Sequence, residues 1–394
     1  MRISTRRFFR PRLTTFVLLA AAVVLFVSIQ GPLGKLVSQR NMRLKLEQAR
    51  RPDMTVRTPS SGSAGDQLNT PENLSSYLKC LDPEWKGSVQ DTLCMKRFDL
   101  LPNYKNPCWI DWTGQLQRLR CLPYFHLLGV DKSGTTDLHS RIVQHPHILY
   151  NNGGIGKETY FWCWVKYGQW MRRTVTPKTF FNYLRAFDKP TAHIANTTDS
   201  RGFHYLITGD GTPMDFWDFR AWPLIPQNKG LKELYSDYVF LGYGLSPEKF
   251  RIDVPRALDM MEKCLKINTT RQCVFSNDTY VNLPMRLHIG MYSVFMKEWL
   301  AVFPRDRFYI LRTEDYQANM KEHLRRIYKF LDVEPLSDKS LDEIVNKTRR
   351  HVTQRKVNLT DMYPDTRELL TKFYSPYNRE LAKILEDPGY LWTS

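Results

Sequence analysis

The chain has 394 residues, with 57 lysines and arginines against 40 aspartates and glutamates, which gives a formal net charge of +17. This excess of positive charge favours a polyanionic partner. The length allows one large domain or two fused ones, besides any targeting segment. No combination of histidines and cysteines has the spacing of a zinc site, so the sequence argues against a zinc-binding module.

The N-terminal segment has the pattern of a membrane signal anchor. Residues 1–12 contain five arginines and no acid, and residues 13–29 are apolar except for two threonines and a serine. As a helix, such a run spans about 25 Å, enough for a thin bilayer. Because the arginines come first, we expect residues 1–12 to be a cytoplasmic tail and the chain after residue 29 to be lumenal. A cleaved signal peptide is the alternative, but Gln30-Gly31-Pro32 is a poor cleavage site.

The lumenal part divides into a stem and a folded domain. Residues 30–77 are polar, with a low-complexity patch at 58–65, and are predicted to be a flexible stem. Residues 78–394 contain all seven cysteines and are predicted to form the folded domain. With a membrane anchor, a sulfated polysaccharide is a better candidate for the polyanionic partner than nucleic acid. The sequence makes no prediction of the oligomeric state.

Cysteines and sequons fit an oxidising, glycosylating compartment. Cys264 and Cys273 flank a polar turn and are predicted to form a disulfide. Four earlier cysteines allow two bridges in three connectivities, and Cys163 is then left as a buried free thiol. Those four are Cys80, Cys94, Cys108 and Cys121. The predicted N-glycosylation sites are the sequons at Asn73, Asn196, Asn268, Asn277, Asn346 and Asn358.

A phosphate-binding loop is predicted near residue 130. Residues 124–130 form an apolar run typical of a buried strand, residues 131–134 a tight turn, and the helical pattern begins at Thr135. Such a strand, Gly-containing loop and helix direct backbone N–H groups and the helix dipole at an anion. A simple helix cap is the alternative. Lys132 stands two residues before Gly134, not directly after it as in a nucleotide triphosphate loop, which argues against an ATPase or kinase.

The rest of the chain alternates strand and helix patterns, which predicts a parallel α/β sheet. Glu158 lies between a lysine and an aromatic run, so it is a candidate general base or an ordinary surface glutamate. Residues 208–213 are predicted to follow a strand end near the same cleft. Further strands are expected at 205–207 and 308–311, and helices at 233–240, 255–266, around 291–300, 317–331 and 366–385.

Several motifs together are far more specific than the loop alone. They are 129–138 (GVDKSGTTDL), 209–218 (GDGTPMDFWD), 234–238 (LYSDY), 285–292 (MRLHIGMY), 310–315 (ILRTED) and 373–378 (FYSPYN). With these motifs the chain resembles the Golgi carbohydrate sulfotransferases, and among them the N-acetylgalactosamine 4-sulfate 6-O-sulfotransferases. The resemblance implies a single P-loop-like α/β sulfotransferase domain with a central parallel sheet flanked by helices.

The resemblance also implies roles for individual residues. The co-substrate would be 3′-phosphoadenosine 5′-phosphosulfate, and no metal would be needed. Glu158 would take the proton of the attacking sugar hydroxyl, and Lys132 would offset charge on the leaving oxygen. Ser236 would bind the 3′-phosphate. The other donor-binding residues would be Lys132, Ser133, Gly134, Thr135 and Thr136 in the loop, and Arg349 and Arg350 in a segment covering the donor.

The implied acceptor is a galactosaminoglycan such as chondroitin or dermatan sulfate, sulfated at the 6-hydroxyl of N-acetylgalactosamine 4-sulfate. The implied location is the Golgi membrane, as a single-pass type II protein. One departure from the family pattern concerns activity. The family's strand ending in Arg-Asp-Pro is absent between Trp222 and Leu234, Glu233 stands in place of a family arginine, and Asp131 replaces a proline. The alternative is a catalytically weak or silent member that binds anionic glycan.

Overall fold

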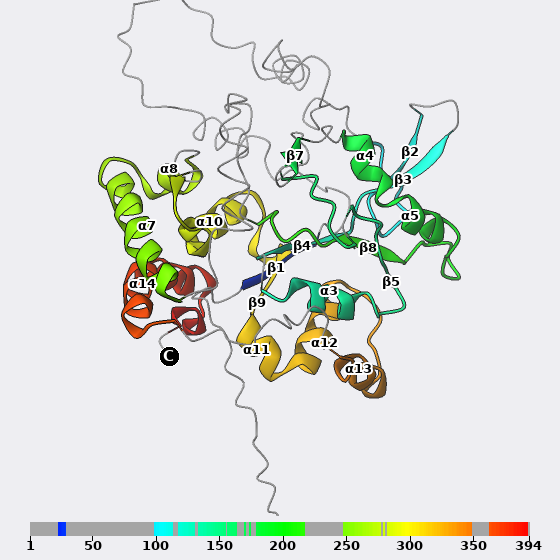
Figure 1. Cartoon of the computed structure of the whole chain (residues 1–394). Helices are drawn as coiled ribbons and strands as arrows, with labels where there is room; N and C mark the ends of the chain where they lie inside the picture. The colour runs from blue at the N-terminus through cyan, green and yellow to red at the C-terminus, as the bar shows by residue number, and fades with distance from the viewer. Residues whose placement is uncertain are drawn as a thin grey trace, which may run out of the picture.

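The computed structural model describes residues 23–28, 98–112, 117–130, 133–154, 156–163, 169–170, 173–174, 179–216, 247–276, 279, 282–348 and 362–392. Its centre is a five-stranded sheet with the order β5-β8-β4-β1-β9, accompanied by two small hairpins, β2-β3 and β6-β7 (Figure 1). The strands are β1 Val23–Ser28, β2 Cys108–Asp111, β3 Arg118–Cys121, β4 Phe125–Gly129, β5 Ile148–Leu149, β6 Gln169–Trp170, β7 Arg173–Thr174, β8 Ile207–Asp210 and β9 Phe308–Arg312.

Four of the five strands in the central sheet run in the same direction. Strand β4 pairs in parallel with β8, which pairs in parallel with β5. Strand β1 is antiparallel to both of its neighbours, β4 and β9, so β9 has the direction of β4. The predicted parallel sheet is therefore confirmed for these four strands, and β1 makes the sheet a mixed one.

Strand β1 comes from the segment that the sequence predicts to be a membrane anchor. Its residues, Val-Val-Leu-Phe-Val-Ser, have high strand propensity. Between β4 and β9 they pair with backbone N–H and C=O groups that an open gap would leave without partners. In the part of the chain that the structure describes, we find no helix with the length and apolarity to cross a membrane. The remainder of the predicted anchor and the whole predicted stem lie outside the described residues, and the anchor stays a prediction.

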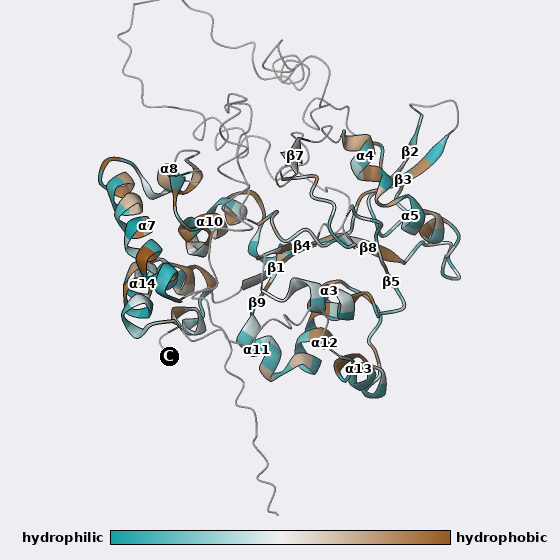
Figure 2. Cartoon of the chain, in the orientation of Figure 1, coloured by the Kyte–Doolittle hydropathy of each residue, from teal (hydrophilic) through white to brown (hydrophobic). Residues whose placement is uncertain are grey.

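Helices cover the sheet on both sides. Figure 1 shows α3, α11, α12 and α13 on one side, while α7, α8, α10 and α14 gather beyond β1 and β9. Several helices contain both hydrophilic and hydrophobic residues, as amphipathic helices do (Figure 2). The α-helices are α3 Thr135–Ile142, α4 Phe180–Arg185, α5 Asp188–Ala195, α7 Pro247–Ile267, α8 Thr270–Phe275, α10 Tyr292–Val302, α11 Thr313–Ala318, α12 Met320–Phe330, α13 Asp338–Val345 and α14 Pro364–Leu385. Short 3-10 helices span Leu287–Gly290, Arg305–Arg307 and Pro388–Leu391.

Most of the predicted elements are present with shifted ends. Helix α7 begins eight residues before its predicted start and includes Pro255. The helix predicted at 317–331 is two helices, because Asn319 leaves the helical conformation and its side chain accepts from the N–H of Glu322 to cap α12. The helix predicted at 233–240 lies outside the described residues.

The buried residues form two large clusters and a smaller one. One lies among α7, α8, α10 and α14, and a second packs α3, α12 and α13 against the sheet through Leu127, Ile207 and Leu311. The third is aromatic and joins α4 to Trp109 of β2 and to Phe161. Phe161 therefore anchors the segment that contains Glu158 in the core.

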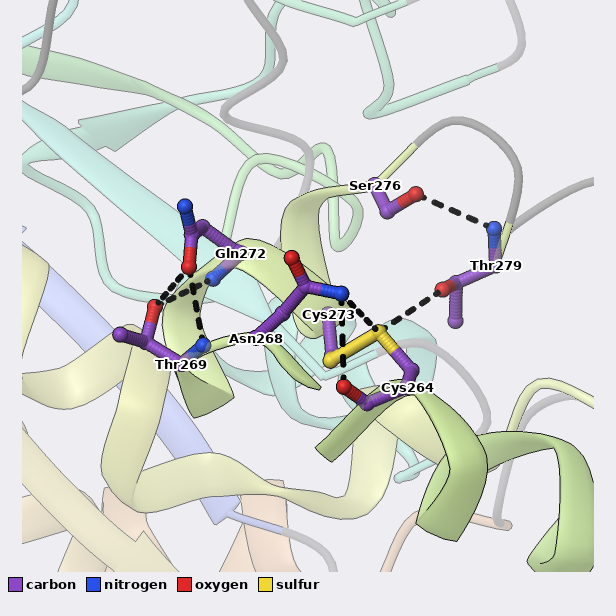
Figure 3. The surroundings of a disulfide bond; sticks show 7 residues. All are labelled: Cys264, Asn268, Thr269, Gln272, Cys273, Ser276 and Thr279. Atoms are coloured by element: carbon purple, nitrogen blue, oxygen red, sulfur yellow. Dashed lines mark hydrogen bonds between the residues drawn. A yellow bond between two sulfur atoms is a disulfide. The ribbon is translucent and has the colours of Figure 1, made fainter. Parts of the chain in front are cut away.

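The structure contains two disulfides among its described residues. Cys264 and Cys273 are bonded, as predicted, and tie the last turns of α7 to α8 (Figure 3). Cys108 and Cys121 face each other in the β2-β3 hairpin and are also bonded. This bond belongs to only one of the three open connectivities, the one that leaves Cys80 and Cys94, both outside the described residues, for each other. Cys163 is buried and forms no disulfide, as predicted, and its thiol donates to the Tyr160 carbonyl at 3.3 Å.

Candidate active site

The predicted phosphate-binding loop joins β4 to α3. Gly134 is the residue before the helix and has φ +82°, a left-handed conformation that glycine adopts without a steric penalty. It is exposed, and an added Cβ would meet no heavy atom within 4 Å. The N–H groups of the first helical turn have no acceptor within the helix and point beyond its N-terminus. Gly134, the last residue of the loop, is therefore exposed to solvent at the N-terminus of α3, where an anion would bind.

The loop residues differ in what they can offer to a ligand. Ser133 is buried, and both its N–H and its hydroxyl donate to the carbonyl of Val130. Its side chain thus shapes the turn, and its predicted contact with the donor stays a prediction. Thr135 is buried and Thr136 is half-buried on the first turn of α3. Lys132 lies outside the described residues, so its predicted role stays a prediction.

Glu158 is held between two donors. The ammonium of Lys157 donates to Glu158 Oε1 at 2.7 Å, and the hydroxyl of Tyr160 donates to Oε2. The Glu158 side chain is 13% exposed. It is not an ordinary surface glutamate, because its carboxylate is mostly buried and both oxygens are fixed.

Lys157 is itself buried, and its ammonium also donates to the carbonyl of Gly211 after β8. Desolvation lowers the pKa of Lys157, while the charge and hydrogen bond of Glu158 and the charges of Asp210 and Asp215 act in the opposite direction. The predicted loop at 208–213 therefore does lie beside the Glu158 segment, as expected.

A buried network of hydrogen bonds stabilises the segment that contains Glu158. Asp210, at the end of β8, accepts from the hydroxyls of Thr159 at 2.6 Å and Thr212 at 2.7 Å. Thr212 in turn accepts from the N–H groups of Thr159 at 2.9 Å and Tyr160 at 3.2 Å. Tyr160 has φ +54°, a left-handed conformation that costs a residue with a side chain about 1–2 kcal/mol. The network thus stabilises a strained backbone two residues after Glu158.

The segment that contains Glu158 packs beside α3 through Lys157 and Gly211. Thr135 and His139 are four residues apart on the helix, so they share a face, and both are buried. A Cβ on Gly211 would lie 3.0 Å from the His139 ring and 2.8 Å from the Lys157 side chain, so all three groups are in close contact. Burial, with a smaller effect of the Lys157 charge, lowers the pKa of His139 to about 3. Lys157 therefore lies beside α3, the helix that follows the predicted phosphate-binding loop.

Helix α3 is also tied to the segment that leads to the predicted donor-covering loop. Arg141 is buried and pairs with Asp137 at 2.9 Å. Its guanidinium donates to the carbonyls of Ile344, Val345 and Lys347 at the end of α13. Arg349 and Arg350 follow two residues later but lie outside the described residues, as does Ser236. The structure therefore describes only the residues just before the predicted donor-covering loop, and Arg141 holds them against α3.

Other predicted sites have a mixed outcome. Asn196, Asn268 and Asn346 are exposed, as glycosylation requires, whereas Asn73, Asn277 and Asn358 lie outside the described residues. His126, Asp210 and Asp215 are the one described group of three with ligand atoms close enough for a cation, within 4.8 Å of one another. Both Asp210 oxygens already accept from threonines, so the group has a structural explanation. That no metal is needed stays a prediction.

Sequence reasoning missed the partners of Glu158. The adjacent lysine was visible as part of the motif, but its burial and its contact with Gly211 depend on how β8 and α3 pack. The roles of Asp210 and Thr212 had a weaker signal, the turn-rich stretch at 208–213, and the role of Thr159 had none. No sequence pattern pointed to His139 or to the φ of Tyr160.

Comparisons with known proteins identify the family of the chain. Residues 235–371 match the model of the sulfotransferase domain. Carbohydrate sulfotransferase 15 of Rattus norvegicus is 30% identical over 318 residues, which cover 71% of this chain and 56% of the relative. Carbohydrate sulfotransferase 15 of Nototodarus sloanii is 35% identical over 142 residues, covering 35% of this chain and 88% of the relative.

A crystal structure of a sulfotransferase from Alicyclobacillus acidocaldarius aligns with 66% of this chain and 95% of its own at 16% identity and a TM-score of 0.34. The chain spans about half the length of the rat relative. The resemblance inferred from the motifs is confirmed by the domain match and the relatives. The chain belongs to the carbohydrate sulfotransferase family.

Proposed function

We propose that the chain transfers a sulfuryl group from 3′-phosphoadenosine 5′-phosphosulfate to a hydroxyl of a galactosaminoglycan. The observation that carries this proposal is that Glu158 is fixed by Lys157 and Tyr160, while Lys157 lies, together with His139 of α3, against Gly211. The segment with the candidate base therefore packs beside the helix that follows the predicted phosphate loop, and sulfuryl transfer to a hydroxyl requires both a phosphate site and a base.

The chemistry follows from these groups. The acceptor oxygen forms a bond to sulfur as the bond between sulfur and the bridging phosphate oxygen breaks, and 3′,5′-adenosine bisphosphate leaves. Glu158 takes the proton of the acceptor hydroxyl. The N–H groups at the start of α3, with Thr135, Thr136 and Lys132, hold the phosphosulfate and stabilise the charge on the leaving oxygen. The exposed Gly134 leaves room for this group.

The proposed acceptor is chondroitin or dermatan sulfate, at the 6-hydroxyl of N-acetylgalactosamine 4-sulfate. The motif resemblance and the net charge of +17 support a sulfated polysaccharide. We further propose that the protein is a type II Golgi membrane protein. The five N-terminal arginines, the two disulfides and the exposed sequons support this location. Residues 23–28 cannot form β1 and a membrane helix in the same molecule, so an anchored chain would give up β1.

The test measures sulfate transfer from labelled donor to chondroitin 4-sulfate, with unsulfated chondroitin and heparan sulfate as competing acceptors. Disaccharide analysis of the product should identify 4,6-disulfated N-acetylgalactosamine. Glu158→Gln should lower kcat about 10²–10⁴-fold. Glu343→Gln, on the exposed surface of α13, is the matched control and should leave it unchanged.

The alternative function, a silent glycan-binding member, rests on the missing Arg-Asp-Pro strand and on Glu233. Calorimetry with 3′,5′-adenosine bisphosphate and with chondroitin 4-sulfate separates the two. Binding of the glycan without the nucleotide, and without any transfer, would favour the silent binder and reject the enzyme.

A further inference from the structure

The carboxylate of Glu158 has a buried neighbour, Lys157, and a half-buried one, Tyr160, and each of them donates to one of its oxygens. Lys157 contacts Oε1 from one side, and Tyr160 contacts Oε2 from the other. Each carboxylate oxygen has a second lone pair, so a substrate hydroxyl can still donate to the fixed group. A general base must lie within hydrogen-bond reach of its proton, and a displacement of about 1 Å can cost 10²-fold in rate.

Both neighbours are held in place by contacts with other residues of the protein. Lys157 is 4% exposed, and the Gly211 carbonyl accepts from its ammonium. Tyr160 is held in its left-handed conformation by Thr212, which Asp210 fixes in turn. Backbone strain of this kind persists where surrounding contacts determine it, and it is concentrated at functional sites.

We propose that Lys157 and Tyr160 are positioning residues that clamp the carboxylate of Glu158 in the orientation needed to accept the proton of the acceptor hydroxyl. This inference rests on the proposed function, because it assigns roles around the proposed base. It does not require either residue to touch the donor or the acceptor.

The charged and titratable groups that face the Lys157–Glu158 pair come from three parts of the fold. Asp210 and Asp215 belong to β8 and the loop after it, His139 belongs to α3, and Tyr160 belongs to the same segment as Glu158. His139 is neutral over the working range, because burial lowers its pKa to about 3. Lys157 is therefore the positively charged group among these neighbours, and its loss leaves the carboxylate of Glu158 without this partner.

The experiment compares Lys157→Met, Lys157→Arg and Tyr160→Phe with Lys189→Met, a control on the exposed surface of α5. Lys157→Met should lower kcat about 10²-fold with the affinity for 3′,5′-adenosine bisphosphate unchanged. Tyr160→Phe should lower kcat about 10-fold, because one of the two fixing hydrogen bonds remains. Lys157→Arg should recover most of the activity. Equal activity of Lys157→Met and wild type, or loss of nucleotide affinity in step with kcat, would overturn the proposal.

The pH profile supplies a readout that a merely structural lysine would not change. Desolvation lowers the pKa of Lys157, so the ammonium is lost on the alkaline side earlier than for a solvated lysine. Arginine stays protonated there. The alkaline limb of kcat should therefore move to higher pH in Lys157→Arg, and an unmoved limb counts against the clamp.

A measurement without turnover keeps the clamp separate from the proposed function. A double-mutant cycle of Lys157→Met and Glu158→Gln, followed by unfolding in denaturant, should give a coupling of about 10-fold or more in the unfolding equilibrium constant. No coupling would refute the clamp even in an active enzyme. If the wild-type chain binds no nucleotide and transfers no sulfate but the coupling is present, the proposed function fails while the contact between the two residues stands.

Discussion

The anchor of α3 on α13 gives the sharpest stability prediction. Arg141→Met removes the ion pair with Asp137 and three donated hydrogen bonds to the carbonyls of Ile344, Val345 and Lys347. The Arg141 side chain is 2% exposed and that of Asp137 is 13% exposed, so water replaces little of what is lost. Breaking a buried pair by removing one partner costs about 3–5 kcal/mol. We expect the free energy of unfolding to fall by that amount.

The matched control is Arg325→Met. Arg325 also bridges two elements, through Glu322 at 2.6 Å and Asp338 at 2.7 Å, but its side chain is 45% exposed. Exposed pairs of this kind contribute about 0–1 kcal/mol. Urea unfolding of the two variants measures the difference, and hydrogen exchange should become faster at residues 344–348 only in Arg141→Met. If the two variants lose equal stability, the idea that burial makes Arg141 the anchor of this segment is wrong.

Three further predictions concern other parts of the site and fold. His139 titrates near 6.5 when unfolded and at about 3 when folded, so the unfolded state binds the extra proton between these values and stability falls as pH drops below 6.5. At pH 5 this loss amounts to about 2 kcal/mol, and the unfolding free energy of His139→Gln measured across pH 5–8 should lack it; a slope identical to wild type would disprove the assignment. Gly134→Ala should cost about 1 kcal/mol in thermal unfolding, because alanine is strained at φ +82°, and should weaken binding of 3′,5′-adenosine bisphosphate; an unchanged Kd would mean that the loop does not need this conformation. Replacing both Cys264 and Cys273 by serine should lower stability by about 2.5 kcal/mol, as expected for opening a short loop, and calorimetry that finds no change would show that the bond does not constrain the unfolded chain.

The disulfide beside Asn268 also places a predicted glycosylation site. Asn268 lies at the end of α7, and its side-chain amide donates to the Cys264 carbonyl at 3.4 Å (Figure 3). Thr269 caps α8 through a reciprocal contact with Gln272, so the sequon overlaps a helix start. Asn268 is exposed, which leaves its amide accessible despite these neighbours.

Local sequence signals determined much of this protein. The apolar run and the glycine near residue 130 specified β4, the turn and the start of α3, because strand propensity and the left-handed conformation of glycine act over a few residues. The close spacing of Cys264 and Cys273 specified their bond. The combination of short motifs specified the family, since each one carries a local geometry that the chemistry needs.

Tertiary structure decided the rest. Whether the Glu158 carboxylate is exposed or held in place depends on Lys157, Gly211 and Tyr160. These residues come together only when β8 pairs with β4 and α3 packs against the loop after β8. Periodicity did not predict that residues 23–28 pair between β4 and β9, because an apolar run of this kind suits a membrane helix and a central strand equally well. The pairing of a strand depends on unpaired backbone N–H and C=O groups of strands that are distant in the sequence. The local hydrophobic pattern of the strand contains no information about those groups.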